Sequence, residues 1–136
     1  MRVVCSGKTG KCLSAKYLAA LSGETEQTEY DVSVGKEYEV FGVAVWRSII
    51  LLLLLDDGNL PDWYPVELFS VADAQLPEDW FFSVSVANEH GVEAIWGYDH
   101  LVRTPSHYEA LLERDPSALR MFFKERWQRA EVTERS

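Results

Sequence analysis

Apolar and polar residues alternate over several short segments of the first hundred residues, and this period of two predicts β-strands. The earliest of these segments is Arg2–Cys5, and another lies within 34–41. A longer strand is predicted over 44–55, because its seven consecutive apolar residues at 49–55 are typical of a strand buried on both faces. Further short strands are predicted at 63–64, 69–71, 80–86 and 92–98.

Turn signals join these strands into hairpins. The sequence Asp56-Asp57-Gly58-Asn59 contains Asp-Gly, which favours a tight hairpin because the backbone there needs positive φ. Asn88–Gly91 predicts a second hairpin, and Pro65–Leu68 suits a single helical turn. The glycine-rich segment 6–12 is predicted to form a loop or a hairpin, and 15–21 either a short helix or a mobile loop.

The spacing of apolar residues changes to three and four after about residue 104, which predicts helices. Thr104-Pro105 and Asp115-Pro116 each place an N-cap residue before a proline at the first helical position. Helices are therefore predicted over 105–113 and 116–129, with their apolar stripes packed onto the sheet. Strands first and helices last indicate an α+β protein.

The length of 136 residues fits one domain, with barrel-like strands over about 1–73, the second hairpin over about 80–98 and two C-terminal helices. Within it, residues 35–71 resemble a small SH3-like barrel. The resemblance rests on the strand Gly-Lys-Glu-Tyr-Glu-Val, the Asp-Asp-Gly-Asn hairpin and the strand, helical turn and closing strand of Trp63–Val71. It implies a small antiparallel barrel or sheet and no particular function, because such barrels serve many unrelated functions.

The charged residues are unevenly distributed along the chain. The whole sequence has 13 Lys and Arg against 22 Asp and Glu, a formal net charge of −9, which argues against sequence-independent binding of nucleic acid. Residues 21–102 contain 16 acidic residues and only two basic ones, Lys36 and Arg47. So many carboxylates cannot all be paired within their own segment. They are either solvated, held by the basic ends of the chain, or available to a cationic partner.

The densest group of acidic residues surrounds two aromatic residues and extends to a second acidic pair before Trp80. In such an arrangement the acids would attract a basic protein, while an exposed aromatic residue, Trp63 or Tyr64, would give contact area as an anchor. The same residues also fit two other interpretations, namely ordinary turn and surface acids, or a metal or acid–base site. The candidate partner-binding residues are Asp56, Asp57, Asp62, Trp63, Tyr64, Glu67, Glu78 and Asp79.

Among the five tryptophans, Trp63 is predicted to be partly exposed because Asp62 and Pro65 flank it. Trp80, Trp96 and Trp127 are predicted to belong to the core, since aromatic residues at strand and helix spacing usually do.

Catalytic and metal-binding motifs are not found in the sequence. Gly7-Lys8-Thr9 lacks the earlier glycine that a phosphate-binding loop requires, because Arg2 occupies that position. Cys5 and Cys12 are expected to be thiols, and the histidines are not grouped by spacing. The apolar run 49–55 is too short to cross a membrane. The sequence therefore predicts a cytoplasmic protein without cofactor, metal or catalytic residues.

The order of elements over residues 30–125 is similar to that of small bacterial immunity proteins of polymorphic toxin systems. The resemblance rests on the Gly-Lys-Glu-Tyr-Glu-Val strand, the apolar strand ending in Asp-Asp-Gly, Trp-Tyr-Pro-Val-Glu-Leu-Phe, the strand begun by Trp80 and the helical segment Ser-His-Tyr-Glu-Ala-Leu. It implies a non-enzymatic acidic protein that binds and inhibits a cognate basic toxin. An SH3-like peptide-binding adaptor and a small metal-dependent hydrolase are the alternatives.

Overall fold

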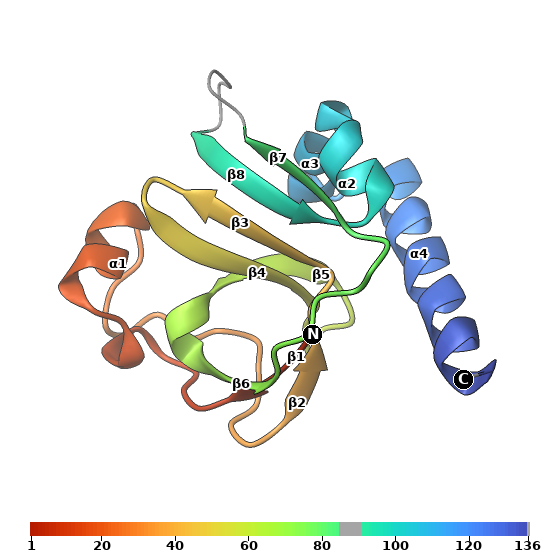
Figure 1. Ribbon diagram of the computed structural model, residues 1–136. Helices are drawn as coiled ribbons and strands as arrows, with labels where there is room; N and C mark the ends of the chain where they lie inside the picture. The colour runs from red at the N-terminus through yellow and green to blue at the C-terminus, as the bar shows by residue number, and fades with distance from the viewer. Residues whose placement is uncertain (85–90, 136) are drawn as a thin grey trace.

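Two antiparallel sheets and four α-helices form the part of the chain that the structure describes (Figure 1). The computed structural model describes residues 1–84 and 91–135, with side chains for 1–84 and 91–130. In the three-stranded sheet, β1 (Arg2–Cys5) lies between β2 (Glu37–Glu39) and β6 (Phe69–Asp73). The α+β class predicted from the sequence is confirmed.

The second sheet has five strands in the order β5-β4-β3-β8-β7. Its central strand, β3, pairs with β4 on one side and with β8 on the other. The hairpin predicted over 80–98 is present as β7 and β8, whereas residues 85–90, with Val86 and the turn residues before Gly91, lie outside the described residues. The strands are β3 (Gly42–Trp46), β4 (Ile49–Leu55), β5 (Pro61–Pro65), β7 (Phe81–Val84) and β8 (Val92–Gly97).

The chain passes directly from one sheet to the other between β2 and β3. The amide of Val40 donates to the carbonyl of Met1 at 3.0 Å, and the next amide, of Phe41, donates to the carbonyl of Leu53 at 2.8 Å. The predicted helical turn is present as the 3-10 helix η2 (Val66–Leu68), followed by β6. The order of elements expected from the SH3-like resemblance is thus present, but the described strand pairs form two separate sheets rather than a closed barrel.

The single strand predicted over 44–55 is wrong, because the chain reverses at Arg47 and Ser48. Both residues have positive φ, 48° and 65°, which is the conformation of a two-residue hairpin turn. Neither residue is the glycine or asparagine that usually marks such a turn. Local contacts hold it instead: the Ser48 amide donates to Glu93 at 3.1 Å, and the Arg47 guanidinium lies 4.5 Å from the centre of the Trp46 ring.

The hairpin predicted at Asp56–Asn59 is confirmed, although the positive φ, 60°, occurs at Asn59 rather than at Gly58. A Cβ atom at Gly58 would lie 2.6 Å from a carboxylate oxygen of Asp31, so a larger residue at this position would make that exposed side chain move aside.

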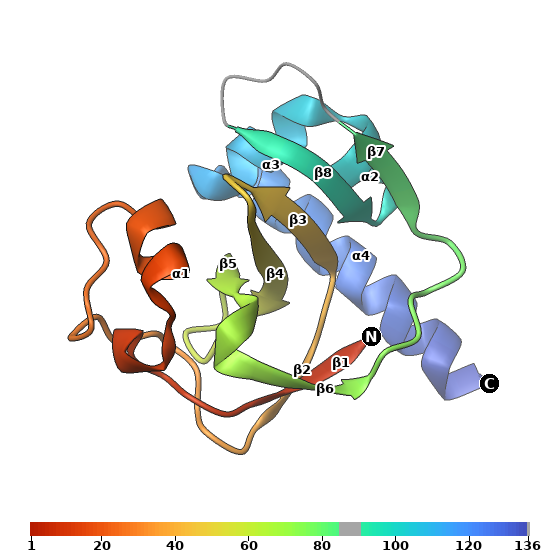
Figure 2. The ribbon, with the colours of Figure 1, turned by 60° about the vertical axis from the view of Figure 1, so that its left-hand side comes forward.

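Helices cover one face of the five-stranded sheet, and α4 crosses behind β3 and β4 in Figure 2. The two predicted helices are confirmed, although the second one ends at Arg135, and a short helix before them was not predicted. Asp115 caps α4 by accepting hydrogen bonds from the amides of Ser117 and Ala118, whereas the side chain of Thr104 makes no capping bond. The three helices are α2 (Asp99–Arg103), α3 (Pro105–Leu112) and α4 (Pro116–Arg135).

The segment between β1 and β2 has little regular structure. It contains the 3-10 helix η1 (Gly10–Cys12) in place of the predicted loop or hairpin, and the short helix α1 (Ala15–Ala20). Ser14 caps α1 by accepting a hydrogen bond from the Tyr17 amide. None of the helices in the described ranges is long and apolar enough to span a membrane.

Two apolar clusters lie on opposite sides of the five-stranded sheet. The first joins it to the three-stranded sheet and includes Val3 and Leu52, and the second joins it to the helices and includes Leu53 and Phe122. The prediction that Trp127 belongs to the core is wrong, since 66% of it is exposed on α4. The other two tryptophans predicted to be core, Trp80 and Trp96, are half-buried.

Candidate functional site

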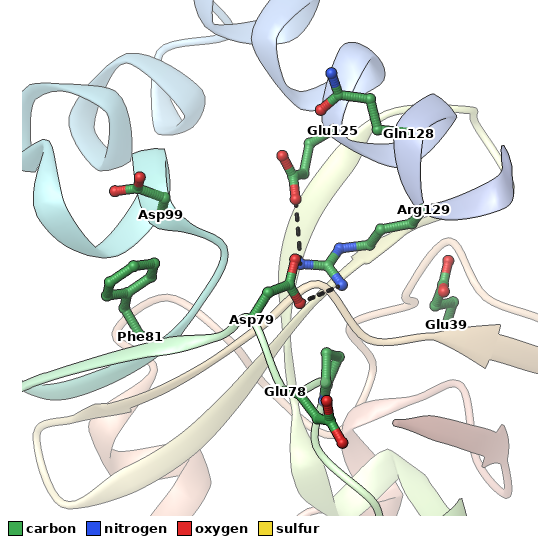
Figure 3. A pocket seen from close by; sticks show the side chains of 9 residues that line it. Glu39, Glu78, Asp79, Phe81, Asp99, Glu125, Gln128 and Arg129 are labelled. Atoms are coloured by element: carbon green, nitrogen blue, oxygen red, sulfur yellow. Dashed lines mark hydrogen bonds and ion pairs between the residues drawn. The ribbon is translucent and has the colours of Figure 1, made fainter. Parts of the chain in front are cut away.

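An open pocket of about 820 Å³ lies where α4 meets β2 and the connection between β6 and β7 (Figure 3). Four parts of the chain contribute to its wall: the end of β2, residues 77–81, the start of α2 and the second half of α4. Most of the lining side chains are acidic. The lining residues are Glu39, Pro77, Glu78, Asp79, Phe81, Asp99, Glu125, Gln128 and Arg129.

Local structure explains why these side chains converge. Glu39 follows the buried Tyr38 on β2, so the alternation of the strand turns it away from the first core cluster. On α4, Glu125, Gln128 and Arg129 are three and four residues apart and therefore share one helical face. That face meets the β6–β7 connection, which carries Glu78 and Asp79.

Arg129 ties α4 to this connection. Its two terminal nitrogens lie 3.2 and 3.3 Å from the two carboxylate oxygens of Asp79, and one of them lies 3.1 Å from Glu125 (Figure 3). Only 13% of the Arg129 side chain is exposed, and its Nε is buried without a hydrogen-bond partner in the described part of the chain. The guanidinium therefore holds the wall of the pocket together while neutralising part of its charge.

The pocket keeps a surplus of negative charge. Five carboxylates line it, against the single guanidinium of Arg129. Within the described residues, neither Glu39 nor Glu78 forms an ion pair, and Asp99 has only an exposed contact of 3.5 Å with Arg103. A concave surface of one charge sign concentrates its field, so this site suits a cationic group such as a lysine or arginine side chain.

Two of the eight residues predicted from the sequence, Glu78 and Asp79, lie in this pocket. Asp56 and Asp57 line a smaller hollow of about 440 Å³, which also contains Lys36. Glu39 lines both hollows, so they adjoin each other along β2.

The expectation that Tyr64 is an exposed anchor is wrong. Tyr64 is 5% exposed, and its hydroxyl donates a hydrogen bond of 2.7 Å to Asp56, itself only 7% exposed. Asp56 also accepts from the Leu60 amide at 3.1 Å. Burial, with the adjacent carboxylate, raises the pKa of Tyr64 well above its ordinary value. These two residues stabilise the β4–β5 hairpin and are not presented to a partner.

Asp57 and Glu67 also have structural partners. Asp57 accepts hydrogen bonds from Lys36 at 2.8 Å, from Tyr38 at 2.7 Å and from Ser33, and these bonds, that of Lys36 above all, lower its pKa to about 2. Glu67 accepts from the amide and hydroxyl of Ser14, at 2.9 and 3.0 Å. Asp57 thus fastens the segment before β2 to the hairpin, and Glu67 fastens the start of α1 to η2.

Asp62 and Trp63 lie on β5, near α3. Asp62 accepts from the Trp63 amide at 2.8 Å and lies 3.4 Å from Arg114. Trp63 is half-buried, as predicted, and its ring packs against Tyr108 with centroids 5.5 Å apart. The eight predicted residues are therefore distributed over several parts of the surface and the interior, rather than over one patch.

Sequence reasoning missed Glu39, Asp99, Glu125 and Arg129. Strand alternation indicates that Glu39 faces outward, and the charge excess in residues 21–102 includes both Glu39 and Asp99. No signal in the sequence indicates that they lie close to α4, because this depends on how the helices pack on the sheet.

Other chemistry-bearing side chains lie outside the pocket. Cys5 is buried and Cys12 exposed, both as free thiols. The hydroxyl of Tyr98 lies 2.7 Å from Nε2 of the buried His107. Among the side chains described, those of residues 1–84 and 91–130, no three His, Cys, Asp or Glu are grouped closely enough to hold a metal ion.

Comparison of this chain with models of known protein families, with curated proteins and with solved structures finds no match. The chemistry of the acidic pocket and of the surface beside it is therefore the basis for assigning a function.

Proposed function

We propose that this chain is a non-enzymatic binding protein that acts in the cytoplasm and inhibits a basic bacterial toxin, as an immunity protein does. The observation that carries the proposal is the pocket in which five carboxylates surround one guanidinium. The resemblance in the order of elements over residues 30–125 and the formal net charge of −9 support the same function.

The pocket can act on a basic partner at two stages. At long range, the surplus negative charge attracts the partner and raises the rate of association, an effect that salt weakens. After contact, Glu39 and Glu78 are available to pair with a cationic side chain, because Asp79 and Glu125 are already held by Arg129. Phe81, at the edge of the same pocket, offers an aromatic surface to the aliphatic or cationic part of that side chain.

The arrangement of side chains favours binding of a basic toxin over the two alternatives, a small hydrolase and a peptide-binding adaptor. A hydrolase would need free acid groups at the centre of the pocket, whereas three of its five carboxylates already contact arginine side chains. A peptide-binding adaptor would expose tryptophan and tyrosine along one groove, whereas among the residues whose burial the structure describes Trp127 is the only exposed tryptophan or tyrosine.

The double variant Glu39→Gln, Glu78→Gln is expected to weaken inhibition of the toxin. Each substitution removes a charge without changing the shape of the side chain. Because a partly exposed ion pair contributes about 0.5–1 kcal/mol, the affinity should fall roughly tenfold. The first measurement is the growth of bacteria that express the neighbouring reading frame, as the candidate toxin, together with either the wild-type chain or the variant. The second is the affinity between the purified candidate toxin and each form of this chain.

The matched control is Glu26→Gln, Glu29→Gln. It removes the same charge from two exposed residues of the segment that follows α1, which lies on the opposite side of the molecule from α4 in both ribbon views. The control should protect the cells as well as the wild type. Equal loss of protection in both variants would contradict a role for the pocket, as would failure of the wild type to protect at all.

A further inference from the structure

β7 is an edge strand directly beside the acidic pocket. In the described part of the chain it pairs with β8 alone, so one side of its backbone has no neighbouring strand. An edge of this kind offers unpaired N–H and C=O groups that another extended segment can bind. Its first residue, Phe81, lines the pocket, so the strand edge and the carboxylates form a continuous surface.

The two faces of β7 differ in chemistry. Phe81 faces the pocket and the helices, with the guanidinium of Arg103 at 5.0 Å from its ring. Phe82 and Val84 point to the opposite face, where they are 54% and 59% exposed. The Phe82 ring lies 4.7 Å from that of its cross-strand neighbour Trp96.

This second face continues as an apolar surface across three strands. The pairing register aligns the side chains in two rows, and all of them are exposed or half-buried. Helices α2–α4 cover the other face of the sheet, so they do not cover these side chains. The first row is Val43, Trp96 and Phe82, and the second is Val45, Ala94 and Val84.

We propose that the free edge of β7 binds an extended segment of the basic partner as an additional strand. Successive side chains of a strand point to opposite faces, so the added segment would place alternate residues in two environments. Lysine or arginine side chains would enter the pocket near Glu39 and Glu78, and the apolar side chains between them would cover Phe82 and Val84. This proposal rests on the proposed function and specifies the partner's sequence pattern, alternately basic and apolar.

The charge of the chain favours a basic partner segment over a second copy of this chain as the strand that binds to β7. Two copies paired through β7 would bring two acidic pockets together, and each chain has a formal net charge of −9. Repulsion between them opposes such a dimer, whereas a basic segment is attracted to the same surface.

Three synthetic octapeptides test the proposal. The first alternates lysine and valine, the second has four lysines followed by four valines, and the third is the alternating peptide with every second backbone nitrogen methylated. All three carry the same charge, but only the first combines the required pattern with free backbone donors. By calorimetry, the alternating peptide should bind at least about tenfold more tightly than either control. It should also slow hydrogen exchange of the backbone amides in residues 81–84.

Variants of the protein make the test specific to β7. Phe82→Thr with Val84→Thr should weaken binding of the alternating peptide severalfold, because threonine keeps the preference for strands but loses apolar contact. The control is Val71→Thr, at a residue of β6 that is 53% exposed. This control should bind the peptide like the wild type.

Four results would overturn strand addition. Three concern the peptides: all three bind equally well, none binds at millimolar concentration, or hydrogen exchange slows elsewhere than in β7. The fourth is a concentration-dependent dimer of the chain that dissociates when Phe82 and Val84 are substituted. Failure of strand addition can be distinguished from failure of the proposed function. If Glu39→Gln, Glu78→Gln reduces protection from the toxin while the peptides show no preference, the acidic pocket binds the partner but β7 does not receive a strand from it.

Discussion

Replacing Phe122 by alanine is expected to lower the free energy of unfolding by about 3–5 kcal/mol, the range for removing a buried phenylalanine side chain. Phe122 is fully buried in the second core cluster and is one of the residues through which α4 packs on the rest of the protein. Its ring packs edge-on against Phe41, with centroids 4.9 Å apart, and also contacts Tyr98. The measurement is the urea midpoint of the variant and of the wild type, with the slope of the transition compared.

The exposed Trp127 on the same helix provides the control. Trp127→Ala also removes a large aromatic side chain, but 66% of this residue is exposed, so the loss should stay below about 1 kcal/mol. If the two substitutions proved equally destabilising, the face of α4 that carries Phe122 would not hold the helix in place. The position of α4 in the wall of the acidic pocket would then depend on other contacts.

Lowering the pH from 7 to 5 is expected to destabilise the protein by about 2 kcal/mol through His107. The residue is 4% exposed, and burial, with a smaller effect from His100, lowers its pKa from 6.5 to about 4. The folded state therefore keeps His107 neutral, while the unfolded state binds a proton below about pH 6.5. Stability from this group is complete above pH 6.5 and is lost as the pH falls towards 4.

The variant His107→Gln separates this effect from the other titrating groups. Glutamine can form a hydrogen bond with the Tyr98 hydroxyl as donor or acceptor but does not titrate, so the free energy of unfolding should depend less on pH between 7 and 5. Tyr98→Phe removes the hydrogen bond and leaves His107 buried, so it should lower the free energy of unfolding by about 1 kcal/mol at both pH values. The dependence of this free energy on pH should stay as in the wild type. An unchanged slope in His107→Gln would show that the folded state accommodates a charged His107.

The elements that the sequence predicted well are those with a strong local signal. Asp-Gly within 56–59 marks a hairpin, and a proline after a capping residue marks the start of α4. The turn at Arg47 and Ser48 was missed because contacts with Trp46 and Glu93, rather than turn residues, hold it. Helix α2 was missed because five residues are too few to show a helical period.

The site was only partly predictable for a related reason. Glu78 and Asp79 were found from local acidity, but the same criterion also selected Asp56 and Asp57, which the fold uses in hydrogen bonds. Whether a carboxylate is free depends on partners that are distant in the sequence. Arg129, fifty residues from Asp79, is an example, because it defines the wall of the pocket and has no signal near the other lining residues.

A nuclear magnetic resonance titration with octalysine distinguishes binding of a cation by this pocket from attraction by acidic residues in general. Amide shifts should concentrate at the pocket, around Glu39, Glu78 and Phe81, and should weaken when salt is raised from about 20 to about 200 mM. The variant Glu39→Gln, Glu78→Gln should reduce these shifts, whereas Glu26→Gln, Glu29→Gln should not. Shifts centred on the 22–29 segment, or unchanged in the Glu39 and Glu78 variant, would contradict binding by this pocket.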